Sequence, residues 1–137
     1  MKRTLLSFVW LGLFWTLLTN VACTQQAVTD SSVVKRVPPD TVQALLAKKD
    51  SLGLLLLDVR TPEEFMQGHI PGAKLIPVQV LEQEIKQIEA YKDKPVIVYC
   101  RSGNRSRTAS RILAKHGFKI IYDMDGGIRQ WKGPIVR

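Results

Sequence analysis

Cysteine and histidine are scarce in this sequence, which contains two of each among its 137 residues. The two cysteines, Cys23 and Cys100, lie far apart in segments of different character, so we expect no structural disulfide. No group of cysteines and histidines has the spacing of a zinc site, and we expect neither a metal nor another cofactor. Cys100 also has no neighbouring cysteine that could resolve a mixed disulfide, which argues against a dithiol oxidoreductase.

Acidic residues are fewer than basic ones, and the formal net charge is +8. A positive balance of this size can attract nucleic acid or anionic lipid. Four arginines, however, gather in one short stretch: Arg101, Arg105, Arg107 and Arg111. We therefore expect a small anionic ligand at that stretch and no nucleic acid, although Arg107 and Arg111 could equally form the solvated surface of a helix.

Residues 1–22 are predicted to be a signal peptide. Lys2 and Arg3 provide the basic start, and a charge-free apolar stretch runs from Leu5 to Leu18. That stretch is short for a membrane-spanning helix and normal for the core of a signal peptide. We therefore expect export, with the chain in the periplasm.

The residues around Cys23 leave the fate of the N-terminus open. Val21-Ala22-Cys23 resembles the last part of the recognition box of bacterial lipoproteins, whereas Asn20 departs from the usual leucine. Lipidation of Cys23 would tether the chain to a membrane, and ordinary cleavage or an uncleaved anchor are the alternatives. Residues 23–32 are small and polar, which predicts a flexible tether.

Residues 33–137 are assigned to one domain, because the length suits a single core and no internal repeat is visible. Short apolar runs that suit strands alternate there with amphipathic stretches. The predicted strands are 33–37, 54–57, 74–77, 95–99 and 118–122. Four helices are predicted. One begins with Asp40 as its cap, one begins with Thr61 as its cap, and the other two cover residues 81–91 and 106–116. This alternation is typical of an α/β fold with a mostly parallel central sheet and helices on both faces.

The segment Cys100–Ser106 joins the predicted strand 95–99 to the helix that follows it. Unpaired N–H groups at the start of a helix carry partial positive charge and favour anions. A loop that contains Gly103 and Asn104 can turn successive N–H groups toward one point. With Arg101 and Arg105 beside it, such a loop is expected to lower the pKa of the thiol and supply a nucleophilic thiolate. The alternative is a buried, inert cysteine, which is common for a free thiol.

Asp58 also follows a predicted strand, and ligands of open parallel sheets bind beyond the carboxyl ends of the strands. We expect Asp58 and Arg60 to form a buried pair that braces the loop, since a charge near the sheet edge needs a partner. The remaining conspicuous side chains have structural interpretations. Glu64 closes a helix-capping box, His69 forms a hydrogen bond within a turn, and Trp131 fills the core under the loop.

Three motifs together resemble those of rhodanese-type sulfurtransferases. Asp58–Phe65 with Gly68–Ala73 is similar to the N-terminal signature of that family, Cys100–Ser106 to its active-site loop, and Gly126–Trp131 to its C-terminal signature. The motifs occur in the family's order across residues 33–137, and three separate matches in one order are a specific signal. A leader before a single domain of this kind resembles exported, phage-shock-type rhodanese-like proteins.

This resemblance implies a role for each residue of the loop. Cys100 would accept a sulfane sulfur from thiosulfate or a similar anionic donor and pass it, as a persulfide, to a thiol or a cyanide-like acceptor. The implied substrate-binding residues are Arg101, Ser102, Gly103, Asn104, Arg105 and Ser106. Asp58 and Arg60 would support the loop without touching the substrate.

Two other functions compete with thiosulfate sulfurtransferase activity. Cysteine-dependent phosphatases and arsenate reductases place an arginine six positions after the cysteine, whereas here Arg105 is at position five and Ser106 at six. Those phosphatases often have histidine immediately before the cysteine, where this chain has Tyr99. A rhodanese-like domain could also act without turnover, as a persulfide carrier, a sensor or a docking module.

Overall fold

The computed structural model describes residues 33–137. The predicted signal peptide, the tether and Cys23 lie outside the described residues. Within the described part, none of the helices combines the length and the apolar character needed to cross a membrane.

A five-stranded sheet forms the centre of the fold, and all of its paired strands are parallel. Its strands are β1 (Val34–Val37), β2 (Leu55–Asp58), β3 (Lys74–Leu75), β4 (Pro95–Tyr99) and β5 (Ile120–Met124). They lie in the order β1-β5-β4-β2-β3, so β4 occupies the middle of the sheet. The predicted α/β fold with a parallel central sheet is therefore confirmed.

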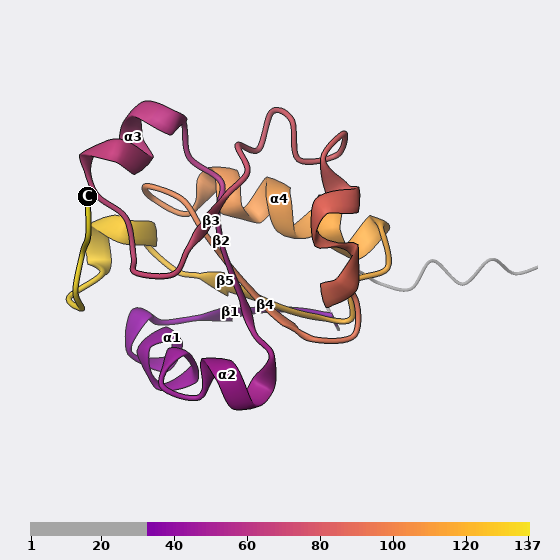
Figure 1. The fold of residues 1–137 in the computed structure, drawn as a ribbon, viewed down its shortest axis with the longest axis horizontal. Coiled ribbons are helices and arrows are strands. Elements are labelled where there is room, and N and C mark those ends of the chain that lie inside the picture. Colours follow the sequence, from indigo (N-terminus) through magenta and orange to yellow (C-terminus); the bar gives the residue numbers. More distant parts are fainter. Residues whose placement is uncertain (1–32) are drawn as a thin grey trace, which may run out of the picture.

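Helices cover both faces of this sheet (Figure 1). The α-helices are α1 (Pro39–Leu46), α2 (Lys49–Leu52), α3 (Pro62–Gln67) and α4 (Asn104–Lys115). Two 3₁₀-helices, η2 (Ile85–Tyr91) and η3 (Gly127–Gln130), complete the domain. In Figure 1, α1 and α2 lie below the sheet, and α4 lies above it.

Side chains alternate between two cores along the central strands. Leu57 and Val98 point into a cluster with residues of η2 and α4, such as Leu113. Their neighbours Leu56 and Ile97 point into a second cluster on the α1 side. Because a strand sends successive side chains to opposite faces, continuous apolar runs such as Leu54–Leu57 are what a sheet covered on both sides requires.

Several predicted boundaries differ from those in the structure. The first helix begins at Pro39 rather than Asp40, because proline loses no hydrogen bond in the first helical turn. Residues 81–91 are not one amphipathic helix: turns precede a 3₁₀-helix that begins at Ile85. The last strand starts at Ile120, since its pairing with β4 begins there and its pairing with β1 at Ile121, and not at the buried Phe118.

Candidate active site

Cys100 directly follows the central strand β4, and four residues later the chain enters α4 at Asn104. Gly103 is the N-terminal cap of α4 and has a φ of +100°, a left-handed conformation that lets the loop close tightly. Its N–H donates a hydrogen bond to Cys100 Sγ at 3.0 Å. The side chain of Cys100 is buried, so the sulfur lies at the bottom of the loop.

Backbone amides set the ionisation of this thiol. Burial by itself raises the pKa of Cys100, but hydrogen bonds from the N–H groups of Ser106, Gly103 and Ser102 lower it, and the net pKa lies below its ordinary value. An amide cradle stabilises an anionic sulfur without a neighbouring base. Of these loop amides, that of Gly103 lies within hydrogen-bonding distance of Cys100 Sγ in the structure.

A second segment holds the loop from outside. Ile128 N–H donates to Cys100 O at 2.8 Å, and Arg129 N–H donates to Arg101 O at 3.2 Å. Both donors belong to η3, which follows the Gly126-Gly127 pair. The C-terminal sequence motif thus contributes backbone donors that fix the position of the cysteine loop.

Arg105 connects the loop to α3. Its guanidinium donates two hydrogen bonds to the Glu64 carboxylate, at 2.6 Å and 2.8 Å. The hydrogen bond from Arg105 is the largest influence on Glu64 and holds the pKa of that carboxyl at about 2. Glu64 also completes the predicted capping box with Thr61. Sequence reasoning found only the capping role, because nothing local links two residues 41 positions apart.

Asp58 and Arg60 form a buried pair at the end of β2. The Arg60 guanidinium donates to Asp58 Oδ2 at 2.7 Å, and both side chains are almost fully excluded from solvent. Arg60 also donates to the carbonyl of Gly68 at 2.8 Å and to that of Glu64 at 3.2 Å. The pair thereby ties β2 to both ends of α3, which carries the partner of Arg105.

Ser106 contacts a carboxylate that sequence reasoning did not single out. Its hydroxyl donates to Asp123 Oδ1 at 2.5 Å, and Arg36 approaches Asp123 Oδ2 at 3.3 Å. Asp123 is buried at the end of β5, and burial raises its pKa in spite of the hydrogen bond from Ser106. A buried acid directly after an apolar strand was the only available signal, and it is a weak one.

The rhodanese-like domain family model matches residues 39–134. The chain belongs to this family. Among curated proteins, this chain is 38% identical over 98 residues to the thiosulfate sulfurtransferase GlpE of Pseudomonas syringae pv. syringae (strain B728a). That alignment covers 72% of this chain and 87% of GlpE. YqhL of Bacillus subtilis (strain 168) is 45% identical over 80 residues, covering 58% of this chain and 62% of YqhL. The chain thus spans less than two thirds of YqhL.

A solved structure agrees with this assignment. The crystal structure of a rhodanese-related protein from Thermoplasma volcanium superposes with a TM-score of 0.61 and 31% sequence identity. The alignment covers 74% of this chain and 97% of that chain. The shared part therefore includes nearly the whole of the compared rhodanese-related domain.

In this rhodanese-like loop, the site residues predicted from the sequence differ in their exposure to solvent. Cys100, Gly103 and Ser106 are buried, Arg105 is half-buried, and Arg101, Ser102 and Asn104 are exposed at the rim. Arg107 and Arg111 are exposed on α4 beyond the loop, which favours their interpretation as solvated helix surface. No three His, Cys, Asp or Glu side chains converge within residues 33–137.

Two residues with structural interpretations also lie near the rhodanese-like motifs. His69 Nδ1 is 3.0 Å from the carbonyl of Phe65, to which it donates when protonated, and its ring stacks on the Phe65 ring. Trp131 is partly buried against the core on the α1 side and donates from Nε1 to the carbonyl of Pro134. Both side chains therefore contribute to packing and turn geometry.

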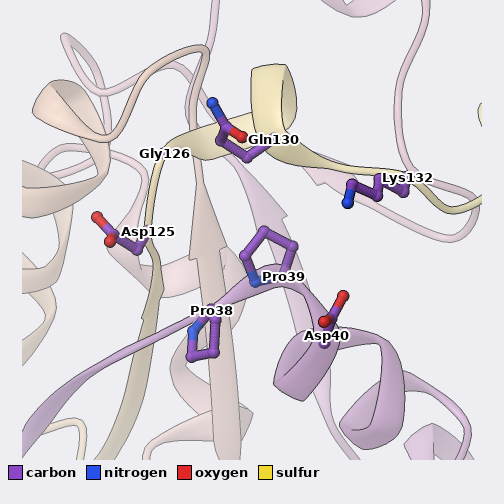
Figure 2. Close-up of a pocket in the computed structure, with 7 residues that line it drawn as sticks. All are labelled: Pro38, Pro39, Asp40, Asp125, Gly126, Gln130 and Lys132. Carbon is purple, nitrogen blue, oxygen red and sulfur yellow. The ribbon is translucent and has the colours of Figure 1, made fainter.

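Two cavities open near the carboxyl ends of the strands. One, of about 370 Å³, borders the cysteine loop at Arg101 and lies between α3, η3 and the C-terminal segment. The other, of about 330 Å³, is shown in Figure 2: Pro38 and Pro39 lie opposite Gln130 and Lys132. No residue of the segment Cys100–Ser106 lines the second cavity.

Proposed function

We propose that this chain is a sulfurtransferase that moves a sulfane sulfur from an anionic donor such as thiosulfate to a thiophilic acceptor, through a persulfide on Cys100. Membership of the rhodanese-like family supports sulfur-transfer chemistry at a coarse level. A relative that covers most of the domain is named thiosulfate sulfurtransferase, which supports the choice of donor. The observation that carries the proposal is the hydrogen bond from Gly103 N–H to the buried Cys100 Sγ.

The reaction requires no general base. The Cys100 thiolate attacks the outer sulfur of thiosulfate, a new sulfur–sulfur bond forms, and the old one breaks as sulfite leaves with the electron pair. The loop amides stabilise the charge on the sulfur that remains, because preorganised dipoles need no reorganisation during the reaction. In the second half, cyanide attacks that sulfur, thiocyanate departs, and Cys100 returns to its thiolate form.

The loop is less suited to a phosphate ester. Both terminal nitrogens of Arg105 donate to the Glu64 carboxylate, so the charge of this guanidinium is already paired and part of its donor capacity is used before a phosphoryl group could bind. The arginine also stands one position too close to the cysteine for the phosphatase pattern. These two features favour transfer of a single sulfur atom over phosphatase or arsenate reductase chemistry.

The proposal is tested by supplying purified protein with thiosulfate and cyanide. We expect thiocyanate to form and intact mass spectrometry to detect one added sulfur atom on the thiosulfate-treated protein. Cys100→Ser should abolish both signals while leaving the thermal unfolding temperature close to that of the parent. Hydrolysis of a phenyl phosphate without thiocyanate would contradict the proposal, and a stable persulfide without turnover would favour a carrier.

A further inference from the structure

Asp123 is a buried carboxylate beside the cysteine loop that the proposed reaction does not use. It belongs to β5, its residue is 2% exposed, and in the sheet register it lies next to Val98 of β4. Ile121, on the same face of β5, packs in the core cluster that contains residues of α4. The side chain of Asp123 therefore points toward α4, and a carboxylate buried there needs polar partners.

The Ser106 hydroxyl stands between this carboxylate and the loop. Two acceptors lie within hydrogen-bonding distance of Ser106 Oγ: Asp123 Oδ1 at 2.5 Å and the carbonyl of Gly103 at 3.2 Å. A hydroxyl group has a single proton to donate, and it rotates to suit its acceptors. Because an ionised carboxylate is a stronger acceptor than a carbonyl, ionised Asp123 draws the proton away from the loop.

Both ends of this arrangement on the loop side lead to the sulfur. Gly103, whose carbonyl is the second acceptor, donates its N–H to Cys100 Sγ at 3.0 Å. Burial raises the pKa of Cys100, whereas the backbone N–H and the side chain of Ser106 are among the groups that lower it. Arg105 is the charged side chain that acts on the thiol. A Ser106 hydroxyl that donates toward the loop thus favours an anionic sulfur.

Two arginines face Asp123 from the elements packed against it. Arg36 of β1 approaches Asp123 Oδ2 at 3.3 Å and the exposed Asp125 at 3.6 Å. Arg107 of α4 acts on Asp123 through its charge. Burial outweighs these cations and raises the pKa of Asp123, while the net pKa of Cys100 is lowered. The two groups therefore titrate closer together than an ordinary aspartate and cysteine do.

We propose that Asp123 is a positioning residue that controls, through the Ser106 hydroxyl, how strongly the cysteine loop stabilises an anionic sulfur on Cys100. Ionised Asp123 accepts the hydroxyl proton. When Asp123 takes up a proton from solvent, its carboxyl becomes the donor to Ser106 Oγ, and the hydroxyl turns its own proton toward the loop. The inference rests on the proposed function for its catalytic consequence, because the same sulfur carries the persulfide.

The experiment titrates the thiol of the full chain by the ultraviolet absorbance of its thiolate, with Cys100→Ser as the blank. Asp123→Asn replaces the carboxylate with an amide of similar shape that donates to Ser106 Oγ at every pH. The acid dissociation constant of the thiol is expected to rise about tenfold. Asp125→Asn is the matched control: it removes the same charge from an exposed partner of Arg36 and should leave the constant nearly unchanged.

A second set of variants tests the path through the hydroxyl. In a Ser106→Ala background, Asp123→Asn should lose most of its effect on the thiol, whereas Ser106→Thr keeps a hydroxyl and should retain the effect. Ser110→Ala is the control, since it deletes another buried hydroxyl of α4 whose Oγ has no hydrogen-bond partner within residues 33–137. Thermal unfolding verifies that each variant is folded.

Two results would overturn the inference. A tenfold effect that persists in Ser106→Ala would show that the charge of Asp123 acts directly through space. An unchanged thiol in Asp123→Asn, or an equal change in Asp125→Asn, would do the same without requiring that Ser106→Ala folds.

The acid limb of the pH profile of thiocyanate formation should move to lower pH in Asp123→Asn by the same factor as the thiol. The thiol titration itself uses no sulfur donor. Absence of thiocyanate from the parent would therefore count against the proposed function, while the titration decides the role of Asp123 separately.

Discussion

Gly127 controls how closely η3 approaches the cysteine loop. Its φ is +61°, and a Cβ at this position would lie 2.5 Å from Cys100 O and 2.6 Å from Arg101 O. Atoms of the main chain cannot move aside as the end of a flexible side chain can. The two hydrogen bonds from η3 to the loop therefore depend on the absence of a side chain at residue 127.

Gly127→Ala is expected to lower both stability and sulfur transfer. The left-handed backbone alone costs an alanine about 1–2 kcal/mol, and the contact with the loop carbonyls adds to it. Gly117→Ala is the control, since Gly117 has a φ of +86° but nothing within 4 Å of the added methyl. Urea unfolding and thiocyanate formation measure the two effects. Equal losses of stability with full activity in both variants would contradict this role of Gly127.

At the scale of elements, the ion pair between Glu64 and Arg105 joins α3 to the first turn of α4. The pKa of Glu64 in the folded protein is about 2, against an ordinary value of 4.5. A carboxyl with a depressed pKa contributes stability that is fully present above the ordinary value and is lost as the pH falls toward the folded one. The pair therefore contributes to stability at neutral pH and fails in acid.

Glu64→Gln should reduce the free energy of unfolding at neutral pH by about 1 kcal/mol, as expected for a partly exposed ion pair. The fall in stability between pH 4.5 and about 2 should be shallower than in the parent, because the variant has no carboxyl to protonate there. Denaturant unfolding across this range measures both effects. Adding Arg105→Gln to Glu64→Gln should cost little more than Glu64→Gln alone, and full additivity would argue against direct coupling.

The helix starts and helix types show which features local sequence patterns can predict. The box formed by Thr61 and Glu64 was predictable, because a cap and its partner stand three residues apart. The 3₁₀ geometry of η2 was not, since the burial of Leu81 and Ile88 satisfies a helical and a 3₁₀ arrangement alike. In such short segments, packing against the sheet decides the helix type.

At the scale of the whole molecule, the N-terminal segment is expected to direct export of the domain from the cytoplasm. We propose export through residues 1–22 and a tether over residues 23–32, on the sequence pattern alone. After expression in a bacterium, the mature chain should lack residues 1–22 and fractionate with the periplasm or the membrane. Intact mass of the N-terminal peptide distinguishes acylated from unmodified Cys23, and a chain that retains Met1 in the cytoplasm would contradict export.

The pattern of residue types along the chain was enough to predict the alternating strands and helices, the parallel sheet and the loop that contains Cys100. These features depend on residues a few positions apart, whose hydrophobic pattern and turn chemistry act before any long-range contact forms. Only the tertiary structure brought Glu64 to Arg105, Asp123 to Ser106, and Arg129 to the cavity that Arg101 of the cysteine loop also lines. Partners from different strands and helices meet only after the sheet has formed, because its strand order determines which strand ends lie side by side.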